Sequence, residues 1–173
     1  MGEDKSLLPF ASSPTLTQYQ FKRFKPYFKN IYISCKSKDK FSFKANFIED
    51  FTQKESSPFV GLISVLEELD DEYVFVLSVD TPFFSFEDFL KLSSNLDADA
   101  IVARTKNSYQ PLCAIYKKSI LPHLKELYHD KSYKFIFLYD KIKVKYVDFE
   151  DEKSFDNLNY KEDYQKALEK TKL

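Results

Sequence analysis

The sequence predicts a single α/β domain with a mostly parallel sheet. Short β-branched segments alternate with segments that carry apolar residues at helical spacing, which is typical of this class. The segment 73–79 (YVFVLSV) is apolar at nearly every position, as expected for a buried central strand that pairs in parallel. The length of 173 residues suits one domain, and no repeat or linker divides residues 1–173.

The first half of the chain predicts two helices and three strands. Ser12 and Ser13 precede Pro14, which indicates a helix start with a capping serine and a proline in the first turn. The helix that follows, residues 15–28, has four apolar residues for one face: Leu16, Tyr19, Phe24 and Tyr27. Strands are expected at 31–35, 46–50 and 73–79, and a second helix at 58–69 with apolar residues Phe59, Leu62, Ile63, Leu66 and Leu69.

The second half continues the alternation. Helices are expected at 86–96, 118–128 and 160–172, and strands at 100–103, 111–116 and 143–149. Segment 132–140 has strand propensity at a length that suits either element, so the residues alone leave it open.

Composition excludes several classes of protein. The formal net charge of −1 gives no field to attract nucleic acid or an anionic membrane. No apolar run approaches the roughly 20 residues of a membrane helix, and no signal peptide opens the chain. The two cysteines, Cys35 and Cys113, form no CxxC pair, which suits a reducing cytoplasm. We therefore expect a cytoplasmic protein that binds neither nucleic acid nor membrane.

Glycine is scarce in this chain. Average usage of about 7% would give roughly a dozen glycines, yet only Gly2 and Gly61 are present. Because glycine allows a positive φ and close approach of a ligand to the backbone, both positions are candidates for a special backbone role.

Three polar residues lie at or just after the carboxyl ends of predicted strands: Ser34, Asp50 and Asp80. Ligands of open α/β sheets bind beyond the carboxyl ends of the strands, so this position favours a binding role. Asp80 precedes Thr81 and Pro82, where the chain must turn, and its carboxylate could hold Mg²⁺ together with substrate phosphates. The alternatives are that Asp80 caps the turn or the next helix, and that Asp50 is a solvated loop acid.

Other reactive residue types give weaker signals. Lys5 lies near Gly2 and could serve as a phosphate-binding charge, although it is one of many lysines. His123 and His129 have no serine or cysteine partner pattern, and Cys113 in PLCAIY is typical of a buried small hydrophobe. Hydrolytic triads and zinc sites therefore have no support.

Seven short strings occur in one order along the chain: MGEDK, IED, SPFVGL, SVDTP, QPLCAIY, VDF and NLNYKEDYQ. MGEDKSLLPF resembles the second half of the nucleotidyltransferase signature L-A-G-G-x-S-x-R-M-G-x-D-K. The set as a whole resembles the molybdenum cofactor guanylyltransferases over almost the whole chain. Gly2 and Gly61 both fall inside these strings.

The resemblance implies a Rossmann-like three-layer nucleotidyltransferase fold. The sequence begins at the methionine of the family's R-M-G, so the family's first strand, glycine-rich phosphate loop and arginine are missing, on the order of a dozen or more residues. We expect residues 1–173 to form one nucleotidyltransferase domain, truncated at its N-terminus by a start site set too far downstream or by a shortened sequence. Such a chain leaves an unpaired buried strand edge and should be unstable or poorly active.

The resemblance also implies roles for individual residues. Lys5 corresponds to the family's phosphate-contacting lysine, Asp50 to an acid that contacts the nucleotide, and Asp80 to the aspartate that binds nucleotide and Mg²⁺. Ser34 stands where the family has a nucleotide-contacting asparagine, and this shorter side chain puts that contact in doubt.

A late family motif, N-x-N-T-P-E-E, corresponds to Asn157 and Asn159, but its Thr-Pro has become Tyr160-Lys161. Arg104 could contact the pterin or cap a surface loop, and we favour the loop. For segment 132–140 the family suggests a helix.

The implied reaction is transfer of GMP from GTP to molybdopterin, with pyrophosphate as the leaving group. A phosphate monoester is largely dianionic at neutral pH, so no general base is needed, and Mg²⁺ on Asp80 together with Lys5 would neutralise charge. The alternatives are a cytidylyl- or sugar-nucleotidyltransferase, or a non-catalytic remnant that binds a cofactor carrier. Cytidylyl relatives usually show D-Q-P, whereas this chain has Asp80-Thr81-Pro82. Molybdoenzymes or their chaperones are further possible partners.

Overall fold

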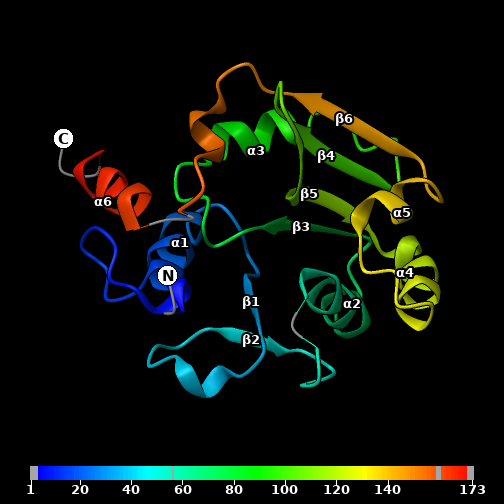
Figure 1. The fold of residues 1–173 in the computed structure, drawn as a ribbon, viewed down its shortest axis with the longest axis horizontal. Helices are drawn as coiled ribbons and strands as arrows, with labels where there is room; N and C mark the ends of the chain where they lie inside the picture. Colours follow the sequence, from blue (N-terminus) through cyan, green and yellow to red (C-terminus); the bar gives the residue numbers. More distant parts are fainter. Residues whose placement is uncertain (1–3, 56, 159–160, 171–173) are drawn as a thin grey trace.

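The computed structural model describes residues 4–55, 57–158 and 161–170, and it confirms the α/β class (Figure 1). The α-helices are α1 (Leu16–Phe24), α2 (Pro58–Glu68), α3 (Phe86–Leu92), α4 (Leu121–His129), α5 (Phe135–Tyr139) and α6 (Lys161–Lys170). The strands are β1 (Tyr32–Cys35), β2 (Asn46–Glu49), β3 (Tyr73–Leu77), β4 (Ala100–Arg104), β5 (Tyr109–Lys117) and β6 (Val144–Asp148). Four short 3₁₀ helices join them: η1 (Lys5–Leu7), η2 (Lys38–Lys40), η3 (Lys118–Ile120) and η4 (Glu152–Phe155). Every predicted helix and strand is found, and the open segment 132–140 contains α5.

Within the described residues the strands form two sheets. One has the order β3-β5-β4-β6, and the other pairs β1 with β2. β1 and β2 are parallel, as are β4 and β6, whereas β5 runs antiparallel to both β3 and β4. A short connection joins β4 to β5 and favours their antiparallel pairing. Because β3 runs in the same direction as β4, it is also antiparallel to β5.

The expectation that 73–79 pairs in parallel as the most buried strand is wrong for the described part of the chain. β3 pairs with β5 in antiparallel register, from Tyr73 opposite Lys117 to Leu77 opposite Cys113. All five β3 residues are half-buried, while the first four residues of β4 are fully buried. The cause is that the other edge of β3 faces an open groove rather than a strand.

Helices cover both faces of the four-stranded sheet and make three layers (Figure 1). α2, α4 and α5 pack on one face, and α1, α3 and η4 pack on the other. Alternation along β4 divides its side chains accordingly: Ala100 and Val102 lie in the first core, and Ile101 and Ala103 in the second.

Helix α1 differs from its prediction in its start and in its buried face. The cap is Thr15, whose side chain accepts from the Gln18 N–H at 3.0 Å, rather than one of the serines before Pro14. The helix ends at Phe24, and Tyr27 beyond it is 53% exposed. The buried helical residues are Leu16, Thr17, Gln20 and Phe24. Two polar side chains, Thr17 and Gln20, are therefore buried together with the predicted Leu16 and Phe24.

Candidate active site

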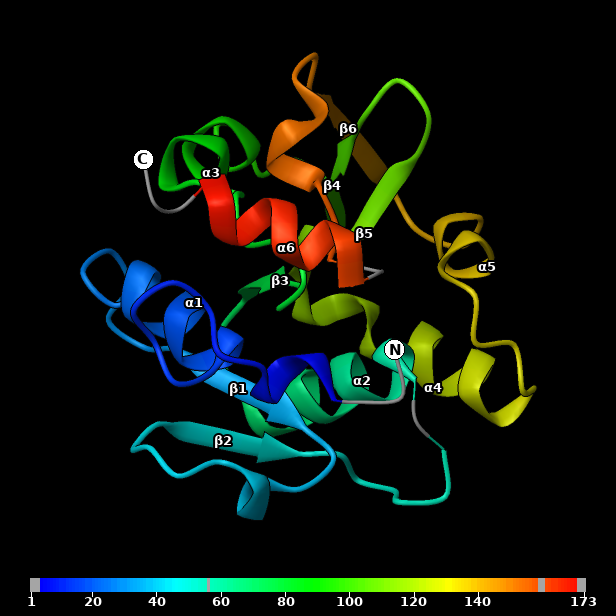
Figure 2. The ribbon, with the colours of Figure 1, turned by 60° about the vertical axis from the view of Figure 1, so that its left-hand side comes forward.

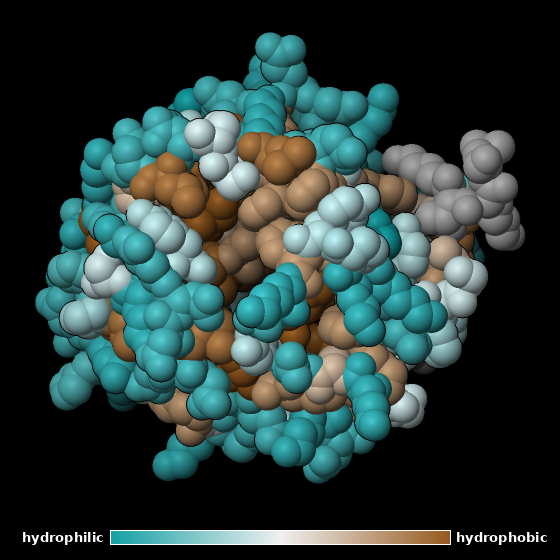
Figure 3. Space-filling view, turned by 180° about the vertical axis from the view of Figure 1, so that it is seen from behind, coloured by the Kyte–Doolittle hydropathy of each residue, from teal (hydrophilic) through white to brown (hydrophobic). Residues whose placement is uncertain are grey.

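A long groove separates β1 from β3, and its cavity volume is about 930 Å³. β1 and the whole of β3 form its two walls, α2 contributes Leu62 and Val65, and α1 contributes Phe24. The view from behind in Figure 3 shows apolar surface collected in a hollow near the middle of that face. Among the described residues β1 pairs only with β2, and β3 only with β5, so each strand turns an unpaired edge to the groove. The expected unpaired strand edge is present.

The carboxyl ends of β1 and β2 bring two predicted residues together at the start of α2. A Cβ built on Gly61 would lie 3.0 Å from Ser34 Oγ and 3.6 Å from Asp50 Oδ1. The absence of a side chain at Gly61 therefore lets the backbone of α2 lie close to both polar side chains. A close approach of this kind is what the scarcity of glycine in the chain suggested for this position. Ser57 caps this helix by accepting from the Phe59 N–H.

Asp50 has a half-buried carboxyl group, and its burial disfavours the charged form. Burial raises the pKa of Asp50 above its ordinary value, and the positive charges of Lys36 and Lys40 only partly offset this effect. Its backbone N–H continues the strand by donating to Cys35 O at 2.9 Å. Asp50 is therefore half-buried rather than fully exposed, and its contact with the nucleotide stays a prediction.

Asp80 lies on a tight turn just after β3. The Ser78 hydroxyl donates to Asp80 Oδ1 at 2.5 Å, and the Asp80 carbonyl accepts from the Leu158 N–H at 3.1 Å. Helix α3 has its own capping box from Ser85 and Asp88, so the alternative that Asp80 caps this helix is wrong. The carboxylate is half-buried beside the carboxyl end of the groove, which Ser78 lines.

Lys5 opens η1, which lies at the same end of the groove. Asp4 and Ser6, on either side of Lys5, line the cavity together with Lys40 from η2. Lys40 Nζ lies 2.7 Å from Asp4 Oδ2. Burial alone would raise the pKa of Asp4, but the hydrogen bonds from Lys40 and Ser6 outweigh it and lower the pKa. The ion pair joins the segment that carries Lys5 to the loop after β1.

The C-terminal part of the site is described only in part. Asn157 is half-buried and immediately precedes Leu158, whose N–H holds the Asp80 carbonyl. This contact brings the Asn157 segment to the Asp80 turn. Asn159 lies outside the described residues.

The comparisons with known proteins identify the family. The family of the MobA-like NTP transferase domain matches residues 1–143. A molybdenum cofactor guanylyltransferase of Campylobacter jejuni subsp. doylei is 40% identical over 169 residues, covering 96% of this chain and 87% of the relative. The chain belongs to the molybdenum cofactor guanylyltransferase family. A molybdenum cofactor guanylyltransferase of Helicobacter pylori is 27% identical to this chain. The alignment covers 96% of this chain and 78% of the relative.

The fold of this chain is also found in a solved structure. Molybdopterin-guanine dinucleotide biosynthesis protein A from Archaeoglobus fulgidus superposes with a TM-score of 0.81 at 20% identity, covering 99% of this chain and 92% of the other. The nucleotidyltransferase fold inferred from the seven strings is thus confirmed.

Arg104 and Cys113, which the sequence also singled out, have structural partners: Arg104 lies opposite Asp148 in the pairing of β4 with β6, and Cys113 Sγ lies 3.8 Å from Thr81 Oγ1. Arg104 forms a bidentate ion pair with Asp148, with Nε to Oδ1 at 2.6 Å and Nη2 to Oδ2 at 3.0 Å. Cys113 is 1% exposed, and burial raises the pKa of its thiol to about 12, as suits a buried small hydrophobe. Within the described ranges, no helix has the length and apolar character that crossing a membrane requires.

Sequence reasoning missed the polar side chains of α1 that reach the site loops. Thr17 donates to Ser6 O at 2.8 Å, and Gln20 Nε2 donates to Thr81 O at 2.9 Å. Arg23 completes the set by donating to Phe84 O at 2.9 Å. One signal was available, since Arg23 is one of only two arginines in a chain rich in lysine.

We expect Asp50→Asn to raise the stability of the folded chain at neutral pH. An acid whose folded pKa is raised loses stability as the pH rises from its ordinary pKa through its folded pKa, and the cost persists at pH 7. The variant removes the charge, so its melting temperature should exceed that of the wild type at pH 7 and match it below about pH 4. Asp39→Asn, an exposed acid on η2, is the control. A lower melting temperature for Asp50→Asn at pH 7 would show that the carboxylate is stabilising.

Proposed function

We propose that the protein transfers GMP from GTP to the terminal phosphate of molybdopterin. An oxygen of that phosphate attacks the α-phosphorus of GTP, the bond from the α-phosphorus to the β-phosphate oxygen breaks, and pyrophosphate leaves. The product is molybdopterin guanine dinucleotide. The observation that carries the proposal is the 40% identity, over 96% of this chain, to a molybdenum cofactor guanylyltransferase.

The arrangement of the site supports this reaction without a general base. The attacking phosphate is already largely dianionic at neutral pH, so the residues need only position the substrates and neutralise charge. Ser34 and Asp50, with the bare backbone of Gly61 beside them, would contact the nucleotide. Lys5 would neutralise phosphate charge. Asn157, whose neighbour Leu158 binds the Asp80 carbonyl, would contact the nucleotide, and the family motif assigns the same role to Asn159.

A divalent ion fits Asp80, and we propose Mg²⁺. Within the described ranges no group of three or more His, Cys, Asp or Glu side chains could enclose a metal. A single carboxylate suits Mg²⁺, which ordinarily takes one or two carboxylates together with substrate phosphates. The ion would supply charge neutralisation at the phosphates, and Asp80 would hold it beside the carboxyl end of β3. A fold neighbour from Mycobacterium tuberculosis is described in complex with manganese.

This arrangement predicts that metal binding depends on the nucleotide. With Mn²⁺ as the probe, the electron paramagnetic resonance signal of the free ion should be unchanged by the protein alone. With GTP present, the protein should cause a further fall, below the signal of the same Mn²⁺ and GTP without protein. Asp80→Asn should abolish the fall, whereas Asp70→Asn, at the other end of β3, should not. Tight Mn²⁺ binding without nucleotide would contradict a site completed by phosphates.

We also propose that residues preceding Asp4 in a longer protein place a strand in the groove between β1 and β3. A strand parallel to β1 and β3 would leave the groove at their carboxyl ends, where Asp4 and Ser6 line it, so the chain direction suits a direct connection. Two unpaired edges and apolar walls match the needs of a central strand. Residues 1–173 would then be one nucleotidyltransferase domain that lacks this strand.

The direct test is product formation. The protein is incubated with molybdopterin, GTP and Mg²⁺, and the products are separated and identified by mass. We expect molybdopterin guanine dinucleotide and an equal amount of pyrophosphate. Absence of both from a chain that includes the upstream strand would favour the non-catalytic alternative, a protein that binds molybdoenzymes or their chaperones. Fractionation of cells would test the predicted cytoplasmic location.

A further inference from the structure

The buried face of α1 carries three polar side chains where a helix packed on a sheet ordinarily presents apolar ones. Thr17 and Gln20 are 6% and 8% exposed, and Arg23 is half-buried. Burying such groups costs free energy unless each finds a hydrogen-bond partner. The partners therefore indicate what this face does.

Two of the three side chains hold the backbone of the turn that follows Asp80. Gln20 Nε2 donates to Thr81 O at 2.9 Å. Arg23 Nη1 donates to the carbonyl oxygen of Pro82 and, at 2.8 Å, to Gln20 Oε1, while Nη2 donates to Phe84 O at 2.9 Å. Carbonyl groups of a loop are usually left to water. Here a helix from 60 residues earlier in the chain binds three of them.

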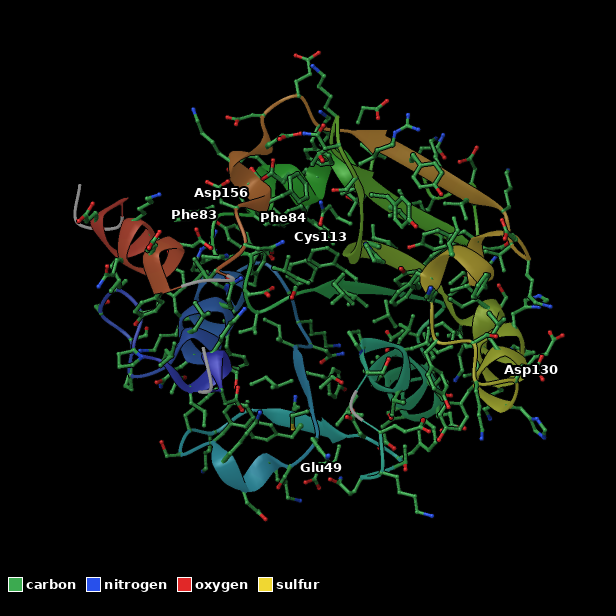
Figure 4. The ribbon with its side chains drawn as sticks, in the orientation of Figure 1. Glu49, Phe83, Phe84, Cys113, Asp130 and Asp156 are labelled. Atoms are coloured by element: carbon green, nitrogen blue, oxygen red, sulfur yellow. The ribbon has the colours of Figure 1, made fainter. Side chains whose placement is uncertain are left out.

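The Arg23 guanidinium is itself held in place. Its Cζ lies 5.3 Å from the centroid of the Tyr19 ring and 5.5 Å from that of Phe24. Burial lowers the pKa of Arg23, but an arginine remains charged at every working pH. Phe84, whose carbonyl oxygen accepts from Arg23, has a fully buried side chain, and its ring centroid lies 5.7 Å from that of Phe155 in η4. Figure 4 shows Phe84 near Asp156, which follows η4. The guanidinium is a rigid, charged donor aimed at one loop.

The other end of the same face reaches the segment that carries Lys5. Thr17 Oγ1 donates to Ser6 O at 2.8 Å, and the Leu16 N–H donates to Leu8 O at 2.7 Å. Figure 2 shows this N-terminal segment beside α1, with which η1 is in contact. One short helix thus binds the two segments that bear Lys5 and Asp80.

We infer that Thr17, Gln20 and Arg23 are positioning residues that set the Asp80 turn relative to the Lys5 segment. The inference rests on the proposed function of Asp80 and Lys5, and adds the element that fixes their geometry. Spaced three residues apart, the three side chains lie along one stripe of α1. They act on the reaction only through the backbone of the two segments.

The test is Arg23→Met in a chain that includes the proposed upstream strand. Methionine keeps an unbranched apolar stem and removes the donors to Pro82 and Phe84. We expect kcat to fall about 10- to 100-fold, because small misplacements of a reacting group have effects of this size. The KM for GTP should change far less, since Ser34 and Asp50 are not held by this stripe. Arg23→Lys should recover only part of kcat, because an ammonium cannot replace the planar fork.

Lys22→Met is the matched control, since it removes the same charge from an exposed position of the same helix. It should keep the wild-type kcat. If Arg23→Met also keeps it, or loses activity only in proportion to its unfolded fraction, the inference is wrong while the proposed function stands.

A second measurement needs no substrate. Hydrogen exchange at the amides of Thr81, Phe83 and Phe84 should be faster in Arg23→Met than in Lys22→Met. If the wild type transfers no GMP, the proposed function fails, and this exchange still decides whether the stripe fixes the turn. Equal exchange in the two variants would overturn the inference.

Discussion

Asp80→Asn is expected to lower kcat for GMP transfer by about 10²- to 10³-fold while the affinity for GTP changes much less. Loss of one preorganised electrostatic group at the reacting phosphates has effects of this size. Asparagine keeps the shape of aspartate and can still interact with the Ser78 hydroxyl that holds Oδ1, so the turn should persist. Steady-state kinetics gives kcat, and calorimetry gives the dissociation constant for GTP.

The control for this variant is Asp70→Asn. Asp70 is exposed before β3, at the end opposite Asp80, and pairs with Lys118 at 2.8 Å. Its removal should leave kcat unchanged, because exposed pairs contribute little even to stability. Unchanged turnover in Asp80→Asn would remove Asp80 from the metal-binding role.

Adding the proposed upstream strand is expected to confer GTP binding and to stabilise the protein by about 5 kcal/mol, the contribution of several backbone hydrogen bonds. A strand in the groove would pair with the free edges of both β1 and β3, and each hydrogen bond contributes about 0.5–1.5 kcal/mol. Its apolar side chains would add about 25 cal/mol per Å² of surface buried in the groove. Urea unfolding of residues 1–173 and of the extended chain measures the first effect, and calorimetry with GTP and Mg²⁺ measures the second.

An extension of equal length made of glycine and serine separates strand pairing from chain length. The glycine and serine extension should raise the free energy of unfolding far less than the strand does. Such a segment has low β propensity and no apolar side chains to bury in the groove. Equal stability of all three chains would show that the groove does not take a strand. The short chain should also associate at high concentration, since unpaired edges pair with one another.

Local sequence signals predicted the elements of the fold well. Apolar spacing located α2 with its buried Phe59, Leu62, Ile63 and Leu66, and alternation located β6. The order of the strands was not accessible in this way. β5 lies between β3 and β4 because of pairings between residues far apart in the sequence, such as Val76 with Ala114. The five-residue helix α5 was undecided because its apolar segment suits either element.

The candidate site, like the fold, could be predicted from the sequence only in part. The rule that ligands bind beyond strand ends selected Ser34, Asp50 and Asp80 from the residues alone, and the structure places the first two together at Gly61. The polar stripe of α1 could not be found, because periodicity treats Thr17 and Gln20 as solvent-facing residues. Only their partners, the carbonyl groups of Ser6 and Thr81, show that they are buried for a reason.

A competition between nucleotides tests the central claim most directly. The extended protein is incubated with molybdopterin, Mg²⁺ and equal concentrations of GTP and CTP, and the dinucleotide products are resolved by mass. The account predicts molybdopterin guanine dinucleotide as the main product, with pyrophosphate in equal amount. A cytosine dinucleotide as the main product would contradict the guanylyltransferase assignment, and no dinucleotide at all would contradict catalysis.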